Sequence, residues 1–336
     1  WQSWGWKKMR TFQREVKKGN SLLDAMQKDC NISGRRLNCI RMEIEYHSEA
    51  SMANAKFSIL IPTWNNLAYL QLCVDSIRRH STYEHQLIVH VNEGSDGTLE
   101  WVHAQKLDFT FSKENVGVCH ALNAAAKLAQ TPYICFLNDD MAVLPNWDAA
   151  LVDEIRGIGH DRWFISGTMI EPTDTRNACA LAPFDFGRNA AAYKEEALVQ
   201  TYARWQKQDW SGATWPPNVV PKSLWEEVGG YSVEFSPGMS SDPDFSMKLW
   251  QVGVRYFKGI AASRVYHFQT KSTGKVKKNN GPRQFLEKWG ITQGSFAKFY
   301  LRRGQPWSGP QPEAGPWLPL AAARLKSFFK RIFSRN

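Results

Sequence analysis

Residues 133–140 read Tyr-Ile-Cys-Phe-Leu-Asn-Asp-Asp, so five bulky, mostly apolar residues are followed directly by three polar ones. An apolar run of this length predicts a strand that is buried on both faces, as the strands of a parallel sheet are. The polar residues come where the strand ends, and ligands bind at that edge of a parallel sheet. We therefore expect Asn138, Asp139 and Asp140 to face a ligand crevice.

Strands and helices alternate in the region that surrounds this stretch. Short apolar runs predict further strands, and apolar residues at helical spacing predict the helices between them. In the first half, strands are expected over 57–61, 87–91 and 109–111, with helices over 67–77 and 118–129. Such alternation predicts an α/β fold with a Rossmann-like, mostly parallel sheet flanked by helices.

The second half of the chain is less regular. A strand is predicted at 163–167, a loop-rich region at 172–217, helices at 222–229 and 243–253, and strands at 254–257 and 264–267. We therefore expect one domain over residues 52–301, with a regular half at about 52–145 and a mixed half at about 146–301.

The ends of the chain differ from this body in composition. Residues 1–51 show no strand pattern and are treated as an N-terminal extension of uncertain status, whereas the prolines and glycines of 302–320 predict a linker. Residues 321–336 predict a basic amphipathic helix, because their apolar residues recur at helical spacing among five basic ones. An anionic membrane surface is the favoured partner of this helix. The alternatives are the protein's own core and another protein.

Charge and composition narrow the class of protein. The 336 residues are 43% hydrophobic and 22% charged, as in a globular protein. The net charge of +10 comes from the ends, because residues 52–320 carry 27 basic and 26 acidic side chains. A nucleic-acid partner is not expected, since it would require a basic face on the folded body. Scattered cysteines, no apolar run of about 18 residues and no evident signal peptide predict a cytoplasmic protein, peripheral on the inner face of the cell membrane.

Polar segments also follow the first two predicted strands. Residues 62–66 read Pro-Thr-Trp-Asn-Asn, and residues 92–97 read Asn-Glu-Gly-Ser-Asp-Gly. Both segments lie at the predicted ligand edge, where small polar side chains can approach a nucleotide closely. The second segment is equally suited to a tight turn, so its composition alone leaves the choice open.

Acidic residues supply the candidates for chemistry. Asp139 and Asp140 repel each other unless a cation lies beside them, and hard divalent cations are commonly shared between carboxylates and phosphates. A solvated acidic turn is the alternative. Asp242 is followed by Pro243 at a predicted helix start, so it either caps the helix or acts as a general base in a cleft. His267 is either a third metal ligand or a structural histidine.

In this order, the segments resemble the motifs of the family 2 glycosyltransferases, which have the GT-A fold. The resemblance covers about residues 57–290. The similar segments are 57–65, 92–98 (Asp-Asn-Gly-Ser-x-Asp-Gly-Thr in the family), 115–117 with Asn123, 138–140 (D-x-D), 228–231 (Gly-Gly-Phe), 241–245 (Glu-Asp-x-Asp) and His267. Three positions depart from the pattern, since Asn92 and Asn138 replace aspartates and Ser241 replaces a glutamate.

The resemblance implies an inverting, metal-dependent transfer of a sugar from a nucleotide-sugar, most of all a UDP-sugar, to a hydroxyl of a glycan or lipid-linked acceptor. Residues 52–145 would then be the nucleotide-sugar half and 146–301 the acceptor half. By this resemblance, Asp242 is the catalytic base, and Asp140 with His267 binds Mn²⁺ or Mg²⁺. The nucleotide-sugar contacts are Pro62, Thr63, Asn65, Asn92, Asp96, Asn115, Gly117, Asn138 and Asp139.

Contacts with the acceptor or the diphosphate are expected from Trp215, Gly230, Asp244, Lys271 and Lys275. A flat tryptophan ring stacks on sugars, and the lysines lie in a basic loop suited to phosphates. Core packing for the tryptophan and a solvated loop for the lysines are the alternatives. Envelope polysaccharide or glycolipid synthesis is the expected process. The other readings are a sugar nucleotidyltransferase and a catalytically silent nucleotide-binding module.

Overall fold

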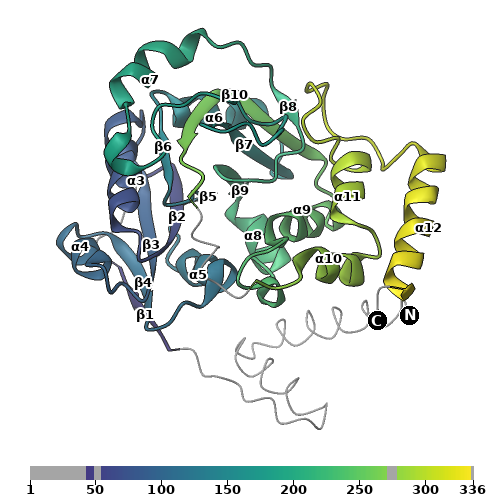
Figure 1. The fold of residues 1–336 in the computed structure, drawn as a ribbon, viewed down its shortest axis with the longest axis horizontal. Coiled ribbons are helices and arrows are strands. Elements are labelled where there is room, and N and C mark those ends of the chain that lie inside the picture. The colour runs from purple at the N-terminus through teal and green to yellow at the C-terminus, as the bar shows by residue number, and fades with distance from the viewer. Residues whose placement is uncertain (1–42, 49–53, 271–277, 334–336) are drawn as a thin grey trace. The chain divides into compact units, whose positions relative to one another are not determined.

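The structure, a computed structural model, describes residues 43–48, 54–270 and 278–333. One ten-stranded mixed sheet runs through these residues (Figure 1), in the order β1-β4-β3-β2-β5-β9-β7-β10-β6, with β8 paired to β10. The strands are β1 Ile44–His47, β2 Phe57–Trp64, β3 Gln86–Asn92, β4 Asp108–Ser112, β5 Tyr133–Phe136, β6 Met141–Val143, β7 Trp163–Ile170, β8 Trp210–Ser211, β9 Asn218–Pro221 and β10 Tyr256–His267.

The predicted α/β fold class is confirmed, with a parallel half and a mixed half. Strands β4, β3, β2 and β5 are mutually parallel neighbours, so their carboxyl ends share one edge. Strand β9 then runs antiparallel to both β5 and β7, while β10 is parallel to β7. The sequence did not predict β9, because its four residues lie directly before a helix and have no pattern of their own.

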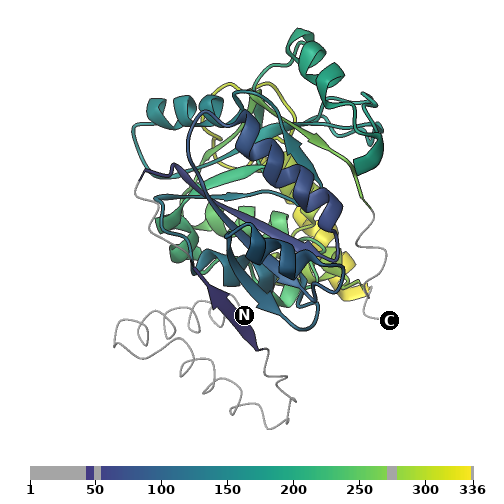
Figure 2. The same cartoon turned by 90° about the vertical axis from the view of Figure 1, so that its left-hand side faces the viewer.

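Helices cover both faces of the sheet (Figure 2). Ile59 and Leu60 of β2 point to opposite faces, as successive residues of a strand must. Ile59 packs in a core with α3 and α6, and Leu60 packs in another with α5, α8 and α9. The helices are α3 Leu67–His80, α4 Thr98–Ala104, α5 Gly117–Ala126, α6 Trp147–Gly157, α7 Glu195–Thr201, α8 Lys222–Val228, α9 Ser241–Gln251, α10 Gly281–Trp289, α11 Gln293–Phe299 and α12 Trp317–Phe333.

Two of the predicted boundaries are wrong. Strand β1 lies within the expected extension but pairs with β4, and its exposed, weakly apolar residues gave no recognisable pattern. The expected linker is held against the domain up to α12, which begins at Trp317. Ser211 N donates to Gln305 O at 2.8 Å, and the backbone N–H of buried Gln311 donates to Arg255 O at 2.7 Å. These paired backbone groups fix a segment whose Pro and Gly content suggested a loose chain.

Strand β10 unites the two strands that were predicted at 254–257 and 264–267. Its pairing with β7 shifts register between Ile260 and Arg264, which explains the break in the apolar pattern. None of the helices within the described part of the chain is both long and apolar enough to cross a membrane.

Candidate active site

A cavity of about 270 Å³ lies at the carboxyl ends of β2, β3 and β5. It is the crevice that the polar residues after those strands predict. Most of the candidate residues line it, although they come from segments far apart in the sequence. They are Pro62, Thr63, Asn92, Asn115, Gly117, Asn138, Asp139, Asp140, Asp242 and His267.

The adjacent carboxylates of Asp139 and Asp140 have different surroundings. Asp139 Oδ2 accepts hydrogen bonds from Thr63 Oγ1 at 2.7 Å and Asn66 Nδ2 at 3.1 Å, so this side chain fastens β5 to the loop after β2. Burial, and then the nearby charge of Asp140, raises the pKa of Asp139. Asp140 Oδ2 accepts from the N–H of Thr270 at 2.9 Å and from its Oγ1 at 2.8 Å. Its Oδ1 has no hydrogen bond from the described residues.

His267 brings a nitrogen to the same place. Its Nε2 lies 3.6 Å from Asp140 Oδ2, and its Nδ1 is 2.9 Å from Oε1 of buried Glu171. Burial lowers the pKa of His267, but the hydrogen bond to Glu171 and the charges of Asp140 and Glu171 outweigh it, so the pKa lies above its usual value. A carboxylate on one ring nitrogen orients the other toward a ligand, as it does in many metal sites.

The residues present fit a divalent cation that is held partly by the substrate. Asp140 offers a free carboxylate oxygen and His267 a ring nitrogen, which suit Mn²⁺ or Mg²⁺. Across the described ranges, no group of three or more His, Cys, Asp or Glu side chains is arranged to hold a metal by itself. The remaining ligands would therefore be phosphate oxygens and water, as is usual for Mg²⁺ bound with a nucleotide.

Asp242 faces the cavity from the first turn of α9. Its Oδ1 accepts a hydrogen bond from the hydroxyl of buried Tyr231 at 2.9 Å, and no donor within the described residues reaches its Oδ2. Burial raises the pKa of Asp242 to about 6, and the Tyr231 hydrogen bond opposes that shift. The carboxyl group is thus largely ionised at pH 7 but remains basic enough to take a proton, as a general base must.

The loops that could hold a nucleotide are fastened to one another. Asn92 Nδ2 donates to Thr63 O at 3.1 Å, and its Oδ1 accepts from Val116 N at 2.9 Å, so this buried amide joins three segments. Gly117 has a positive φ of 76°, and a Cβ there would lie 2.7 Å from Pro237 Cα. Trp64 Nε1 is buried beside the cavity without a hydrogen-bond partner among the described residues, which leaves a donor for a ligand.

Two residues predicted to contact the nucleotide do not line the cavity. Asp96 is exposed, and its carboxylate accepts from Leu67 N at 2.9 Å and from Thr98 N at 3.1 Å, which joins the starts of α3 and α4. Asn65 bonds Glu93 Oε2 and Ser95 N. Both side chains therefore shape the loops, and their direct contact with the nucleotide stays a prediction.

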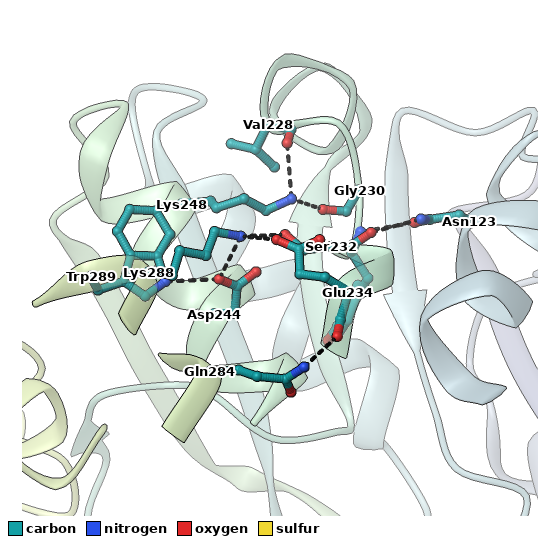
Figure 3. A network of polar contacts seen from close by, with 11 residues as sticks. Asn123, Val228, Gly230, Ser232, Glu234, Asp244, Lys248, Gln284, Lys288 and Trp289 are labelled. Atoms are coloured by element: carbon teal, nitrogen blue, oxygen red, sulfur yellow. Dashed lines mark hydrogen bonds and ion pairs between the residues drawn. The ribbon is translucent and has the colours of Figure 1, made fainter. Parts of the chain in front are cut away.

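Asp244 and Gly230 do not line the cavity and belong to a network of polar contacts (Figure 3). Asp244 is fully buried, and its Oδ1 is 2.8 Å from Trp289 Nε1 and 2.9 Å from Lys288 Nζ. Gly230 O accepts from Lys248 Nζ, and a Cβ at this glycine would lie 2.3 Å from Asn123 Oδ1. These contacts tie α9 to α10 and to the loop after α8, so a direct contact with the acceptor is not supported.

The remaining candidates lie elsewhere. Trp215 lines a second, adjoining cavity, and Lys271 and Lys275 lie outside the described residues. Sequence reasoning missed Glu171, Tyr231 and Trp64 as site residues. Glu171 directly follows β7, so the rule that found Asp140 would have found it had the strand been extended from residue 167 to 170.

Residues 58–201 match the model of the family described as glycosyl transferase family 2. The matched segment comprises 144 of the 336 residues, which is less than half of the chain. The family 2 segment contains β2 to β7, and with them Asn92 and the pair at 139 and 140, so the predicted family is confirmed for that part of the chain. Asp242 and His267 lie beyond it in sequence and reach its cavity through α9 and β10.

Individual proteins that resemble this chain do so over a short segment or at low sequence identity. Over 92 residues, the chain is 30% identical to the teichoic acid poly(glycerol phosphate) polymerase of Staphylococcus epidermidis. The aligned segment makes up 25% of this chain and 13% of that protein. The chain thus spans about 13% of the length of this curated relative. The fold is similar to a crystal structure of S. aureus TarS 1-349, with a TM-score of 0.49 and 15% sequence identity. The superposition covers 84% of this chain and 72% of the TarS chain. The same protein with UDP-GlcNAc covers 69% and 64% at the same identity and TM-score.

Proposed function

We propose that this chain is a metal-dependent, inverting glycosyltransferase that moves a sugar from a nucleotide-sugar to a hydroxyl group of a glycan or lipid-linked acceptor. One observation carries the proposal. The ionisable Asp242 and the pair of Asp140 and His267 line a single cavity, although β5, α9 and β10 bring them from distant parts of the chain. The match of residues 58–201 to the family model supports the reaction class.

The donor would occupy the cavity with its nucleoside against Pro62, Thr63 and Asn115, and a uridine diphosphate sugar is the proposed donor. Asp140 and His267 would hold the cation, which would offset the charge that develops on the departing diphosphate. Because 92 residues of the chain are similar to a teichoic acid polymerase, we propose an acceptor from cell-envelope polymer synthesis.

The carboxylate of Asp242 then completes the transfer. It takes the proton of the acceptor hydroxyl, whose oxygen forms a new bond to the anomeric carbon. The bond between that carbon and the phosphate oxygen breaks, and its electron pair leaves with the nucleoside diphosphate. Tyr231 holds the carboxylate in place through Oδ1, which leaves Oδ2 for the proton.

Release of nucleoside diphosphate tests the proposal. The chain is incubated with Mn²⁺ and a panel of nucleotide-sugars, with and without acceptor extracts, and both products are identified by mass spectrometry. Sugar transfer with diphosphate release supports the proposal. Formation of a nucleotide-sugar from a sugar phosphate would indicate a nucleotidyltransferase, and binding without turnover would indicate a silent module.

The pKa of Asp242 predicts the pH dependence of the reaction. Because only the ionised carboxylate accepts a proton, kcat/KM is expected to be constant above about pH 7 and to fall about tenfold per unit below about pH 6. Tyr231→Phe removes the hydrogen bond that lowers this pKa, so the acidic limb should move to higher pH. A pH–rate profile of both proteins measures the shift, and an unmoved limb would show that another group is the base.

Helix α12 is proposed to bind an anionic membrane surface. Its Leu320 and Ser327 are buried, and Arg324 donates to the hydroxyl of Tyr300 at 2.8 Å. Six of its large apolar side chains are about half or more exposed, namely Trp317 at 74%, Leu318 at 62%, Leu325 at 57%, Phe328 at 55%, Phe329 at 47% and Ile332 at 47%. Basic side chains lie among them, which favours anionic headgroups.

Binding to vesicles tests this surface. The double variant Leu325→Glu, Phe328→Glu is expected to lower partition onto phosphatidylcholine vesicles with 30% phosphatidylglycerol by about tenfold or more, because two apolar side chains lose their burial in lipid. Lys326→Gln should lose about fivefold on the same vesicles, since a basic residue contributes about 1 kcal/mol near an anionic surface. Cosedimentation measures both. Dimerisation without vesicle binding would instead make this face a protein interface.

A further inference from the structure

A second cavity, of about 520 Å³, adjoins the proposed donor cavity. Asn138, Asp242 and His267 line both cavities, so the candidate base lies between them. The donor-side residues Pro62, Asn115 and Asp140 line only the first. If the first cavity takes the donor, the second is therefore the place from which an acceptor hydroxyl reaches Asp242.

The acidic groups of the second cavity are already engaged. Glu171 is buried, its Oε1 lies 2.9 Å from His267 Nδ1, and its Oε2 accepts from Thr175 Oγ1 at 3.3 Å. Asp242 keeps one oxygen for the proposed proton transfer. No other acidic side chain among the described residues lines this cavity.

Arg303 on the same wall is a cation without a counter-ion. Its guanidinium lies 4.2 Å from the centre of the Trp215 ring, and the described residues provide neither a carboxylate nor a hydrogen-bond acceptor for it. The side chain is partly buried, and burial lowers its pKa. Arg176, whose N–H donates to Asp174 Oδ1 at 2.7 Å but whose guanidinium has no hydrogen bond or ion pair among the described residues, also lines the cavity. Such groups bind carboxylates and phosphates through paired hydrogen bonds.

The backbone holds Arg303 in this position. Its N–H donates to Ala297 O at 3.0 Å, and the next N–H, that of Gly304, donates to Ser211 O at 2.9 Å. A Cβ on Gly212 would lie 2.7 Å from Arg303 Cα, so the two segments pack as closely as a glycine permits. The backbone of Arg303 is thus held in place, and the stacking of its guanidinium on Trp215 restricts the side chain, which lowers the entropy that binding costs.

We propose that the second cavity binds an acceptor that carries a phosphate or a carboxylate group, and that Arg303, stacked on Trp215, binds this anion while the acceptor hydroxyl faces Asp242. This inference rests on the proposed function and adds the chemical class of the acceptor. The diphosphate of the donor is a poorer match for Arg303, because this residue does not line the cavity of Asp140.

Matched pairs of small probes test the anion site without any turnover. Glycerol 3-phosphate is compared with glycerol, and methyl β-glucuronide with methyl β-glucoside, by calorimetric titration of the full chain. The charged member of at least one pair should bind about tenfold more tightly, as a hydrogen-bonded charge contributes. The pair that shows the difference identifies phosphate or carboxylate as the anion.

Variants of Arg303 test whether this residue causes the difference in affinity between the charged and the neutral probes. Arg303→Gln should remove it, and Arg303→Lys should keep part of it because the charge remains without the planar fork. Arg255→Gln is the matched control, since Arg255 stacks on Trp250 at 4.0 Å but lies outside both cavities, and it should leave the preference unchanged. The thermal unfolding midpoint of each variant shows whether it folds.

Two results would overturn the inference. They are equal binding of charged and neutral probes by the unaltered chain, and a preference for the anion that survives in folded Arg303→Gln. Release of nucleoside diphosphate is measured separately with the unaltered chain. A chain that releases none, yet binds the anion through Arg303, would refute the proposed function and leave the anion site intact.

Discussion

Asp242→Asn is expected to lower kcat by about 10²–10⁴-fold, the usual contribution of a general base. The amide has nearly the same shape and can still accept the hydrogen bond that Tyr231 donates at 2.9 Å, but it cannot take a proton from the acceptor. Donor binding should survive, because the cation ligands Asp140 and His267 are unchanged. Steady-state kinetics with separate measurement of the donor Kd checks both expectations.

Asp153→Asn provides the control for this variant. Asp153 is an exposed aspartate on α6 that pairs with Arg156 at 3.0 Å and lines neither cavity. Its replacement should leave kcat within about twofold, since exposed ion pairs contribute little. Near-normal kcat in folded Asp242→Asn would place the base on another residue.

The sequence predicts at which edge of the sheet the site lies, because the ends of strands can be recognised from local sequence. Asn92 and Asp140 were expected to converge, since each follows an apolar run in a parallel array, and both line the cavity. The antiparallel β9 is different. Its four residues acquire their place only by pairing with β5 and β7, and that pairing is a tertiary contact without a local signal.

Two neighbouring aspartates on α9 have different roles because they contact residues from different parts of the chain. Asp242 and Asp244 lie two residues apart on α9, yet Asp242 lines the cavity while Asp244 is buried against Lys288 and Trp289. On an α-helix, residues two apart point in different directions, so which one faces the site depends on how α9 packs. The sequence around the two aspartates does not predict the contact with residues 288 and 289, which lie more than forty positions away.

Asp140→Asn is expected to lower kcat/KM by about 10²–10³-fold and to abolish the metal dependence of donor binding, because the proposed charge partner of the cation is lost. The amide oxygen can still accept the hydrogen bonds from Thr270, so the fold of the segment should persist. The donor Kd is measured with Mn²⁺ and after chelation. The unaltered chain should lose affinity on chelation, and the variant should show little further change.

Asp139→Asn separates the two neighbouring carboxylates. Asp139 accepts hydrogen bonds from Thr63 and Asn66, which the amide oxygen of asparagine can also accept, so this variant should keep the fold, the loop after β2 and the response to metal. His267→Ala should weaken the response to metal as Asp140→Asn does, but less, because a neutral imidazole contributes no charge. If Asp140→Asn binds the donor with an unaltered response to Mn²⁺, or if the unaltered chain works fully after chelation, then the carboxylate of Asp140 does not serve a cation.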